Sequence, residues 1–140
     1  MLNHIYNQQI TILNKLNRSD STNGKDVWYK HTVNNAAWYE EVIRDVLQNG
    51  VAIGTVIKVL IPFNDEYQDY KEWKSNNDRS SFYTMSSGDY IILGDVTENV
   101  TSENVVAITR QYSHSLCTVK HVTKPHKRFG VNVQLKVEGI

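Results

Sequence analysis

The sequence predicts an all-β, mainly antiparallel domain, either a small β-barrel or a sandwich, with long loops and one short helix. Three observations support this. Apolar and β-branched residues arrive in short blocks, with a spacing nearer to two residues than to 3.6. Polar turn residues separate the blocks. About six blocks are present, and an antiparallel sheet of that size must hide its edges, which closure into a barrel does most completely.

The first strands are expected in the N-terminal third. Residues 10–13 form the first apolar block, and residues 18–25, rich in Ser, Asn, Asp and Gly, predict a solvated loop. A second strand is expected at residues 27–29. Asn34 and Asn35 then predict a tight turn, followed by a partner strand over residues 36–43.

The clearest strand signal covers residues 51–63. Val, Ile and Leu dominate it up to Pro62, which cannot donate a hydrogen bond to a central ladder, so the strand should end there. Residues 64–80 then predict a long polar loop with a short helix at residues 69–74.

The remaining elements follow the same logic. A helix is expected after Thr101 or Ser102, either of which can cap its first turn, and Val105, Ile108 and Tyr112 then share one face. Four further strands are predicted, at residues 81–85, 90–93, 116–122 and 131–137. The last two should form a hairpin.

Length and composition favour a single domain, residues 1–140. With 40% hydrophobic and 10% aromatic residues, the chain can build a core without a cofactor, metal or disulfide. Fifteen basic residues balance fifteen acidic ones, so no net field attracts nucleic acid or a membrane. Neither a secretory leader nor an apolar run long enough for a bilayer is evident, so we expect cytoplasmic synthesis and no membrane partner.

Motifs of catalysis are missing from the sequence, and we therefore expect a protein that is not an enzyme and has no cofactor. It contains no phosphate-binding Gly-rich loop, nucleophile elbow or metalloprotease helix motif. His114, Cys117, His121 and His126 are residue types that bind zinc. Their spacing matches no zinc pattern, so one core cysteine and three surface histidines are the favoured interpretation.

A basic run near the C-terminus is the first candidate for recognition. It consists of Lys120, Lys124, His126, Lys127 and Arg128. These side chains could contact DNA phosphates, or pair with acidic residues of a neighbouring subunit. They could equally form a solvated hairpin tip, and the three interpretations stay open.

The aromatic loop is the second candidate. Tyr67, Tyr70 and Trp73 lie in an otherwise polar segment. Tyr and Trp are enriched at interface hot spots, but they also anchor long loops to their own domain. The composition favours interface use slightly.

Several short segments also follow one another in a characteristic order. They are residues 10–15 (ITILNK), the pairs 28–29 and 38–39 (both WY), 61–62 (IP), 87–94 (SGDYIILG) and 127–130 (KRFG) before a last strand. In this order they resemble small minor capsid or head–tail connector proteins, which tailed bacteriophages of Gram-positive bacteria encode in their structural gene cluster. The similarity spans most of the chain.

This resemblance implies a virion protein of the neck, made in the cytoplasm of the bacterial host. It would be a head-closure (stopper) component that forms a homo-oligomeric ring. Its partners would be further copies, the portal or adaptor protein, and the tail terminator or tail tube protein, with non-specific contact to packaged DNA. Two alternatives stay open: a tail component such as a tail terminator or tube-associated protein, and a less favoured nucleic-acid-binding β-barrel.

Overall fold

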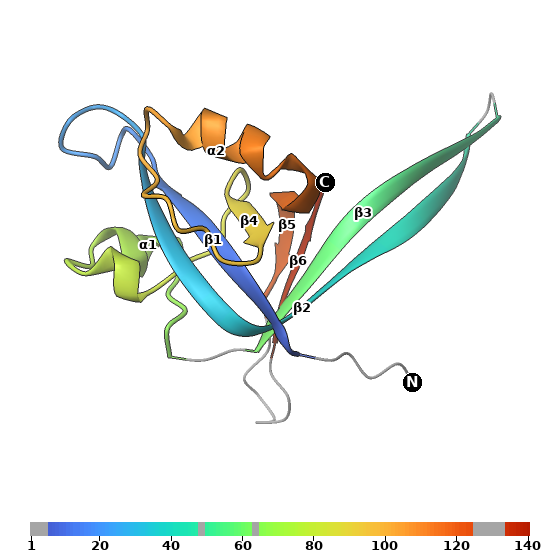
Figure 1. The fold of residues 1–140 in the computed structure, drawn as a ribbon, viewed down its shortest axis with the longest axis horizontal. Coiled ribbons are helices and arrows are strands. Elements are labelled where there is room, and N and C mark those ends of the chain that lie inside the picture. Colours follow the sequence, from blue (N-terminus) through green and yellow to red (C-terminus); the bar gives the residue numbers. More distant parts are fainter. Residues whose placement is uncertain (1–5, 48–49, 63–64, 125–133) are drawn as a thin grey trace.

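The computed structural model describes residues 6–47, 50–62, 65–124 and 134–140. Its strands close into a barrel in the order β1-β2-β3-β6-β5-β4, with every pairing antiparallel (Figure 1). The predicted β class is confirmed, in its barrel form. The strands are β1 Gln8–Leu16, β2 Val27–Leu47, β3 Gly50–Pro62, β4 Tyr90–Leu93, β5 Leu116–Thr123 and β6 Gln134–Gly139.

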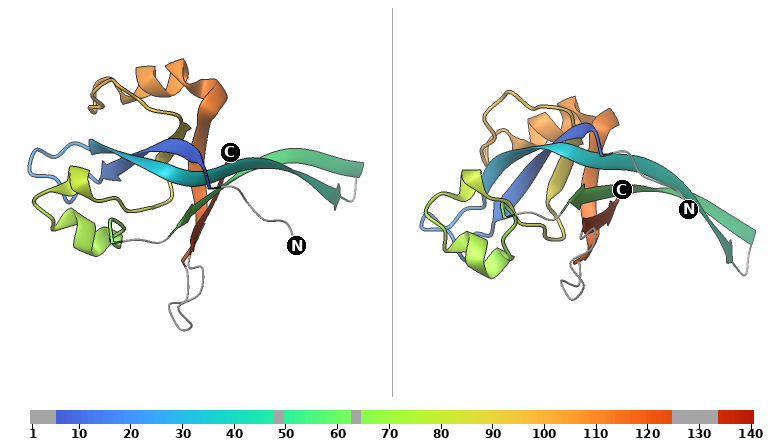
Figure 2. Two further views of the ribbon diagram at one scale, coloured as in Figure 1. Left: turned by 60° about the horizontal axis from the view of Figure 1, so that its bottom comes forward. Right: turned by 90° about the horizontal axis from the view of Figure 1, so that it is seen from below.

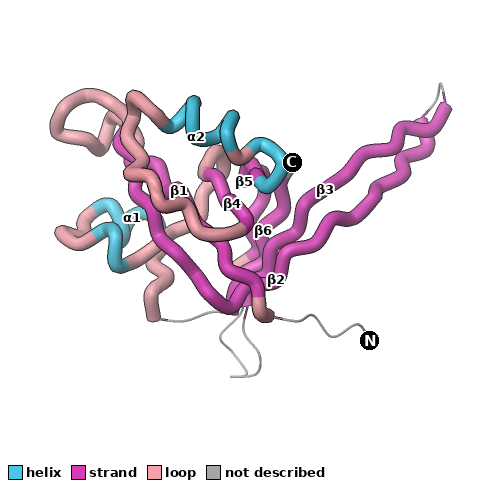
Figure 3. The backbone as a smooth tube through the Cα atoms, viewed as in Figure 1, coloured by secondary structure: helices cyan, strands magenta, loops and turns pink. Residues whose placement is uncertain are grey.

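Helical segments are short, as Figure 3 shows. They are α1 Tyr70–Lys74, α2 Val105–Gln111 and the 3-10 turns η1 Arg79–Ser81 and η2 Ser113–Ser115. The helix predicted at residues 69–74 is therefore confirmed. Within the described part of the chain, no helix has the length and apolar character needed to cross a membrane.

The predicted turn at Asn34 and Asn35 is wrong, because β2 continues through both residues as one long strand. At this point the strand changes partner: Ala36 pairs with Gln8 of β1, whereas Ala37 pairs with Leu60 of β3. A register irregularity accommodates the change, because Asn34 and Asn35 of β2 lie opposite the single residue Gln9 of β1. The two asparagines are exposed, and the residues that flank them, Val33 and Ala36, both pair with β1, so the chain continues as a strand instead of turning.

The strand predicted at residues 81–85 is also wrong. Only an isolated parallel bridge joins Tyr83 to Tyr67. The next residue, Thr84, bonds to a side chain instead of a strand: its N–H donates to Asn14 Oδ1 at 3.2 Å, and its carbonyl accepts from Asn14 Nδ2 at 2.7 Å. The buried side-chain amide of Asn14 thus makes the backbone hydrogen bonds that a neighbouring strand would otherwise make with this segment.

Two apolar clusters hold the domain together. The barrel interior contains residues from every strand, including Ile12, Val59 and Leu135, all fully buried. A second cluster lies between the barrel wall and α2, where Ile108 packs with Leu13 and Ile92. The predicted apolar face of the helix is therefore confirmed, since Val105 and Ile108 are buried and Tyr112 packs against the same cluster.

The other strand predictions are confirmed where the structure describes them. β3 ends at Pro62, and β5 and β6 pair as the expected hairpin. Residues 131–133 of the last predicted strand lie outside the described residues.

Candidate assembly interface

β2 and β3 continue beyond the barrel as a two-stranded arm, residues 41–47 and 50–56, which projects away from the body in Figures 1 and 2. β2 pairs with β1 only as far as Ala36, and β3 pairs with β6 only from Ile57 onward. Within the described chain, the two arm strands are therefore paired only with each other. At about 3.4 Å per residue, seven residue pairs extend the arm by about 24 Å.

The arm exposes apolar side chains. Val42 is 68% exposed and Ile43 37% exposed, so two of the large hydrophobic residues that face solvent lie here. An isolated two-stranded ribbon is only marginally stable in water, and exposed apolar groups at its surface add nothing to that stability. A projecting ribbon of this kind is stabilised most when a partner covers its apolar side chains.

An ion pair fixes the base of the arm. Lys58 Nζ donates to Glu41 Oε2 at 2.7 Å across the β2–β3 ladder, and the Lys58 side chain is only 15% exposed. The hydrogen bond from Lys58 lowers the pKa of Glu41, and the same bond raises the pKa of Lys58. The pair ties the two strands together where they leave the barrel.

Trp73, one of the three aromatic residues singled out in the long loop, is fully buried in its own domain. Its ring packs edge-to-face on Tyr29 of β2, with the centroids 5.5 Å apart. Its Nε1–H donates to the Arg79 carbonyl at 3.3 Å, and the Arg79 guanidinium lies over the Tyr29 ring. In this structure Trp73 anchors the loop to the barrel, which is the second of the two roles that the sequence left open.

Tyr67 and Tyr70 are partly buried by similar contacts. Tyr67 meets Tyr83 edge-to-face at 5.6 Å, and burial raises its pKa. The Tyr70 hydroxyl donates to Asp20 Oδ2 at 2.7 Å and accepts from the Asn17 N–H at 3.1 Å, so it connects the loop to the segment after β1. Burial also raises the pKa of Tyr70.

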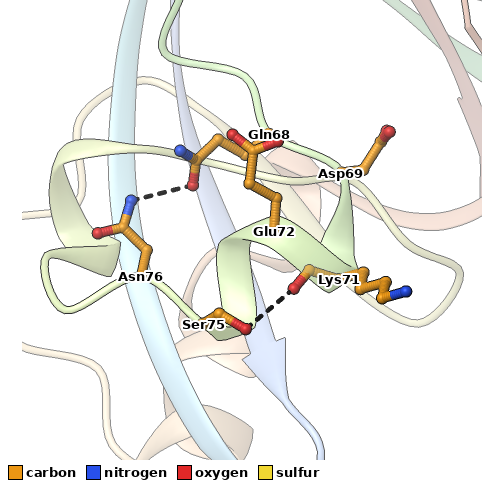
Figure 4. Close-up of a pocket in the computed structure, with 6 residues that line it drawn as sticks. All are labelled: Gln68, Asp69, Lys71, Glu72, Ser75 and Asn76. Carbon is orange, nitrogen blue, oxygen red and sulfur yellow. Dashed lines mark hydrogen bonds between the residues drawn. The ribbon is translucent and has the colours of Figure 1, made fainter.

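A shallow, open hollow lies on the outer side of α1 (Figure 4). Its lining is polar and partly engaged within the loop: Asn76 Nδ2 donates to Gln68 Oε1 at 3.0 Å, and the Ser75 hydroxyl donates to the Lys71 carbonyl at 3.3 Å. The full lining is Gln68, Asp69, Lys71, Glu72, Ser75 and Asn76. Such a hollow lacks the enclosed apolar walls of a typical small-molecule site.

Comparison with known protein families finds a match over nearly the whole chain. Residues 5–139 fit the model of DUF6751, a family of unknown function. The chain belongs to the DUF6751 family. Neither the curated proteins nor the solved structures contain a significant match. The family match thus covers nearly the whole chain, but the family description names no activity.

The described part of the basic run in this DUF6751 protein lies at the end of β5. Lys120 is exposed on the strand, next to a register irregularity in its pairing with β6. Lys124 Nζ donates to Asp69 Oδ1 at 2.8 Å, in a pair of which both side chains are more than half exposed. His126, Lys127 and Arg128 lie outside the described residues. The contact from Lys124 joins the basic run to the aromatic loop, two segments that the sequence treated separately.

The zinc-type residues are not brought together where the structure describes them. Cys117 is fully buried in the barrel interior, where burial raises the pKa of its thiol to about 12. His114 and His121 are exposed, and no group of three metal-binding side chains occurs among the described residues.

A buried polar network surrounds Asp89, which is 1% exposed and was not predicted from the sequence. Its Oδ2 accepts from Asn14 Nδ2 and from the Ser86 N–H, both at 3.0 Å, and its Oδ1 accepts from the Lys15 N–H at 3.1 Å. Burial raises the pKa of Asp89 to about 6, although these donors oppose the rise. Asn14 inside an apolar strand was the available signal, because a buried amide needs partners.

Proposed function

We propose that this DUF6751 protein is a non-catalytic structural subunit of a bacteriophage neck, a head–tail connector or head-closure component that assembles into a ring. The observation that carries the proposal is the β2–β3 arm, which projects from a closed barrel and whose outer edges pair with no other strand among the residues that the structure describes. The biological setting is taken from the resemblance of the order of sequence segments to that of phage connector proteins.

The rest of the molecule supports an assembly role. A closed barrel hides the edges of its own sheet, so association is directed to the arm. The long loop is fastened to the barrel by Trp73 and Tyr70, which makes the body a rigid base for that arm. Heterologous contacts between identical rigid subunits generate a closed ring when the rotation between neighbours closes.

A nucleic-acid-binding barrel receives less support. Single-strand binders present aromatic rings on which bases stack, beside basic side chains. Here Trp73 is buried and packs edge-to-face on Tyr29 of its own domain, and Lys124 pairs with Asp69. A tail-side ring subunit would use the arm in the same way as a neck subunit, and the experiment below separates the two.

The test is electron microscopy of particles made by a phage that lacks this gene. DNA-filled heads that leak, together with complete unattached tails, are the expected result. Misterminated or missing tails would assign the protein to the tail, and intact infectious particles would refute a structural role.

Complementation with two matched variants tests whether the arm carries the function. Val42→Lys places a charge at a valine of the arm that is 68% exposed, and Val106→Lys does so at a valine of α2 that is 57% exposed. Both changes are at solvent-facing positions, so both proteins should fold. We expect Val106→Lys to restore particles and Val42→Lys to fail; equal complementation by the two would contradict the role of the arm.

A further inference from the structure

The two outer edges of the arm differ in charge. On the β2 side, residues 41–47 include Glu41, Arg44 and Asp45, whereas residues 50–56 on the β3 side (GVAIGTV) contain no charged residue and no proline. Charges and prolines are the usual means of protecting an open strand edge from pairing. The β3 edge lacks this protection, so it is the edge that is suited to accept another strand.

We propose that the β3 edge of each arm pairs with the β2 edge of the arm of the next copy, so that the arms lie side by side around the ring. This inference rests on the proposed function, since it names how the ring subunits contact one another. Arms related by rotation about a ring axis all point the same way. The β3 strand of one copy and the β2 strand of the next then run in opposite directions, and the sheet continues as an antiparallel one.

The charge pattern favours this pairing over the two symmetric alternatives. Pairing two β2 edges would set two charged strands side by side and would leave the uncharged β3 edges, which lack protection, open. Pairing two β3 edges is electrostatically neutral but leaves both β2 edges open. Only the β2–β3 contact gives the main-chain N–H and C=O groups on both edges of each arm a hydrogen-bond partner, and it sets the charged strand against an uncharged one.

The size of the contact and the charge of the whole chain are consistent with self-association. Seven residues on each edge provide about seven main-chain hydrogen bonds per contact. A formal net charge of zero gives copies no long-range repulsion to overcome. Neighbouring arms would also cover part of the surface of Val42.

Cysteine cross-linking tests the pairing. One copy carries Val42→Cys on β2, a second, larger tagged copy carries Thr55→Cys on β3, and the mixture is treated with a flexible bismaleimide. These two residues face each other within one arm, so they lie at the same height along it. The native Cys117 is fully buried and should not react. Ser102→Cys, at an exposed position before α2, serves as the control.

We expect the mixed Val42→Cys and Thr55→Cys product to dominate, both in concentrated purified protein and in isolated particles. A product formed only between two Thr55→Cys copies would indicate two-fold pairing and overturn the inference. Arm cross-linking no greater than that of Ser102→Cys in both samples would overturn it as well. If the mixed product forms but deletion of the gene leaves particles intact, the pairing stands and the neck role fails. If deletion of the gene gives leaking heads and unattached tails but no mixed product forms, the neck role stands and the pairing fails.

Discussion

The burial of Asp89 should make the stability of this protein depend on pH in a specific direction. The pKa of Asp89 is about 6 in the folded protein, against the usual 3.8 that applies when the chain is unfolded. Because the folded state holds the proton more tightly, protonation stabilises it. This contribution is fully present below pH 3.8 and is lost as the pH rises through 6.

The magnitude follows from the two pKa values. A rise from 3.8 to about 6 corresponds to about 3 kcal/mol in total, of which about 2 kcal/mol is recovered on going from pH 8 to pH 4.5. Carboxylates with a lowered pKa, such as that of Glu98, oppose this only near or below their usual range. Between pH 8 and pH 4.5, the Asp89 contribution should therefore be visible.

The assay is urea unfolding followed by tryptophan fluorescence at pH 8 and pH 4.5, for the wild type, Asp89→Asn and the exposed control Asp95→Asn. The free energy of unfolding of the wild type should gain about 2 kcal/mol more at pH 4.5 than that of Asp89→Asn. The Asn side chain also places an NH2 group among N–H donors, so this variant should be less stable at pH 4.5. Parallel pH dependence for wild type and Asp89→Asn would refute the reasoning.

Further predictions concern packing. Trp73→Ala should lower the free energy of unfolding by about 3–5 kcal/mol, because a fully buried indole is removed, and Trp73→Phe should retain much of the lost stability; chemical denaturation checks both. Gly139→Ala should cost about 1–3 kcal/mol, since its Cβ would clash with the Thr118 carbonyl oxygen and lie 2.5 Å from Cys117 Sγ. Gly54→Ala, where a Cβ meets nothing within 4 Å, should instead be neutral or stabilising by roughly 0.5 kcal/mol; equal melting temperatures for the two glycine variants would contradict the packing argument.

Much of the barrel could be predicted because its signals are local. Pro62 ends β3 where its missing N–H requires, and Val105, Ile108 and Tyr112 share the helix face that their spacing predicts. The two wrong predictions, the turn at residues 34–35 and the strand at 81–85, come from segments whose local preference is overridden by distant partners. In the second of these, the partner is Asn14, 70 residues away.

The candidate interface was less accessible from sequence. The aromatic residues were recognised, but composition cannot tell an indole that binds a partner from one that packs against Tyr29, as Trp73 does. Only residues 41–43 and 51–56 of the arm were predicted as strand, and as ordinary strand, because alternation and β-branched residues describe a strand without saying which of its edges are paired.

By itself, the sequence determined that this chain makes antiparallel strands with a small helix, one apolar helix face and a strand stop at Pro62, since these depend on contacts between near neighbours in the chain. The tertiary structure decided that the sheet closes, that Asp89 is buried among three hydrogen-bond donors, and that β2 and β3 extend beyond the strands next to them to form an arm. Each of these depends on which segments far apart in sequence come to lie side by side, and that information resides in the packing of the whole chain.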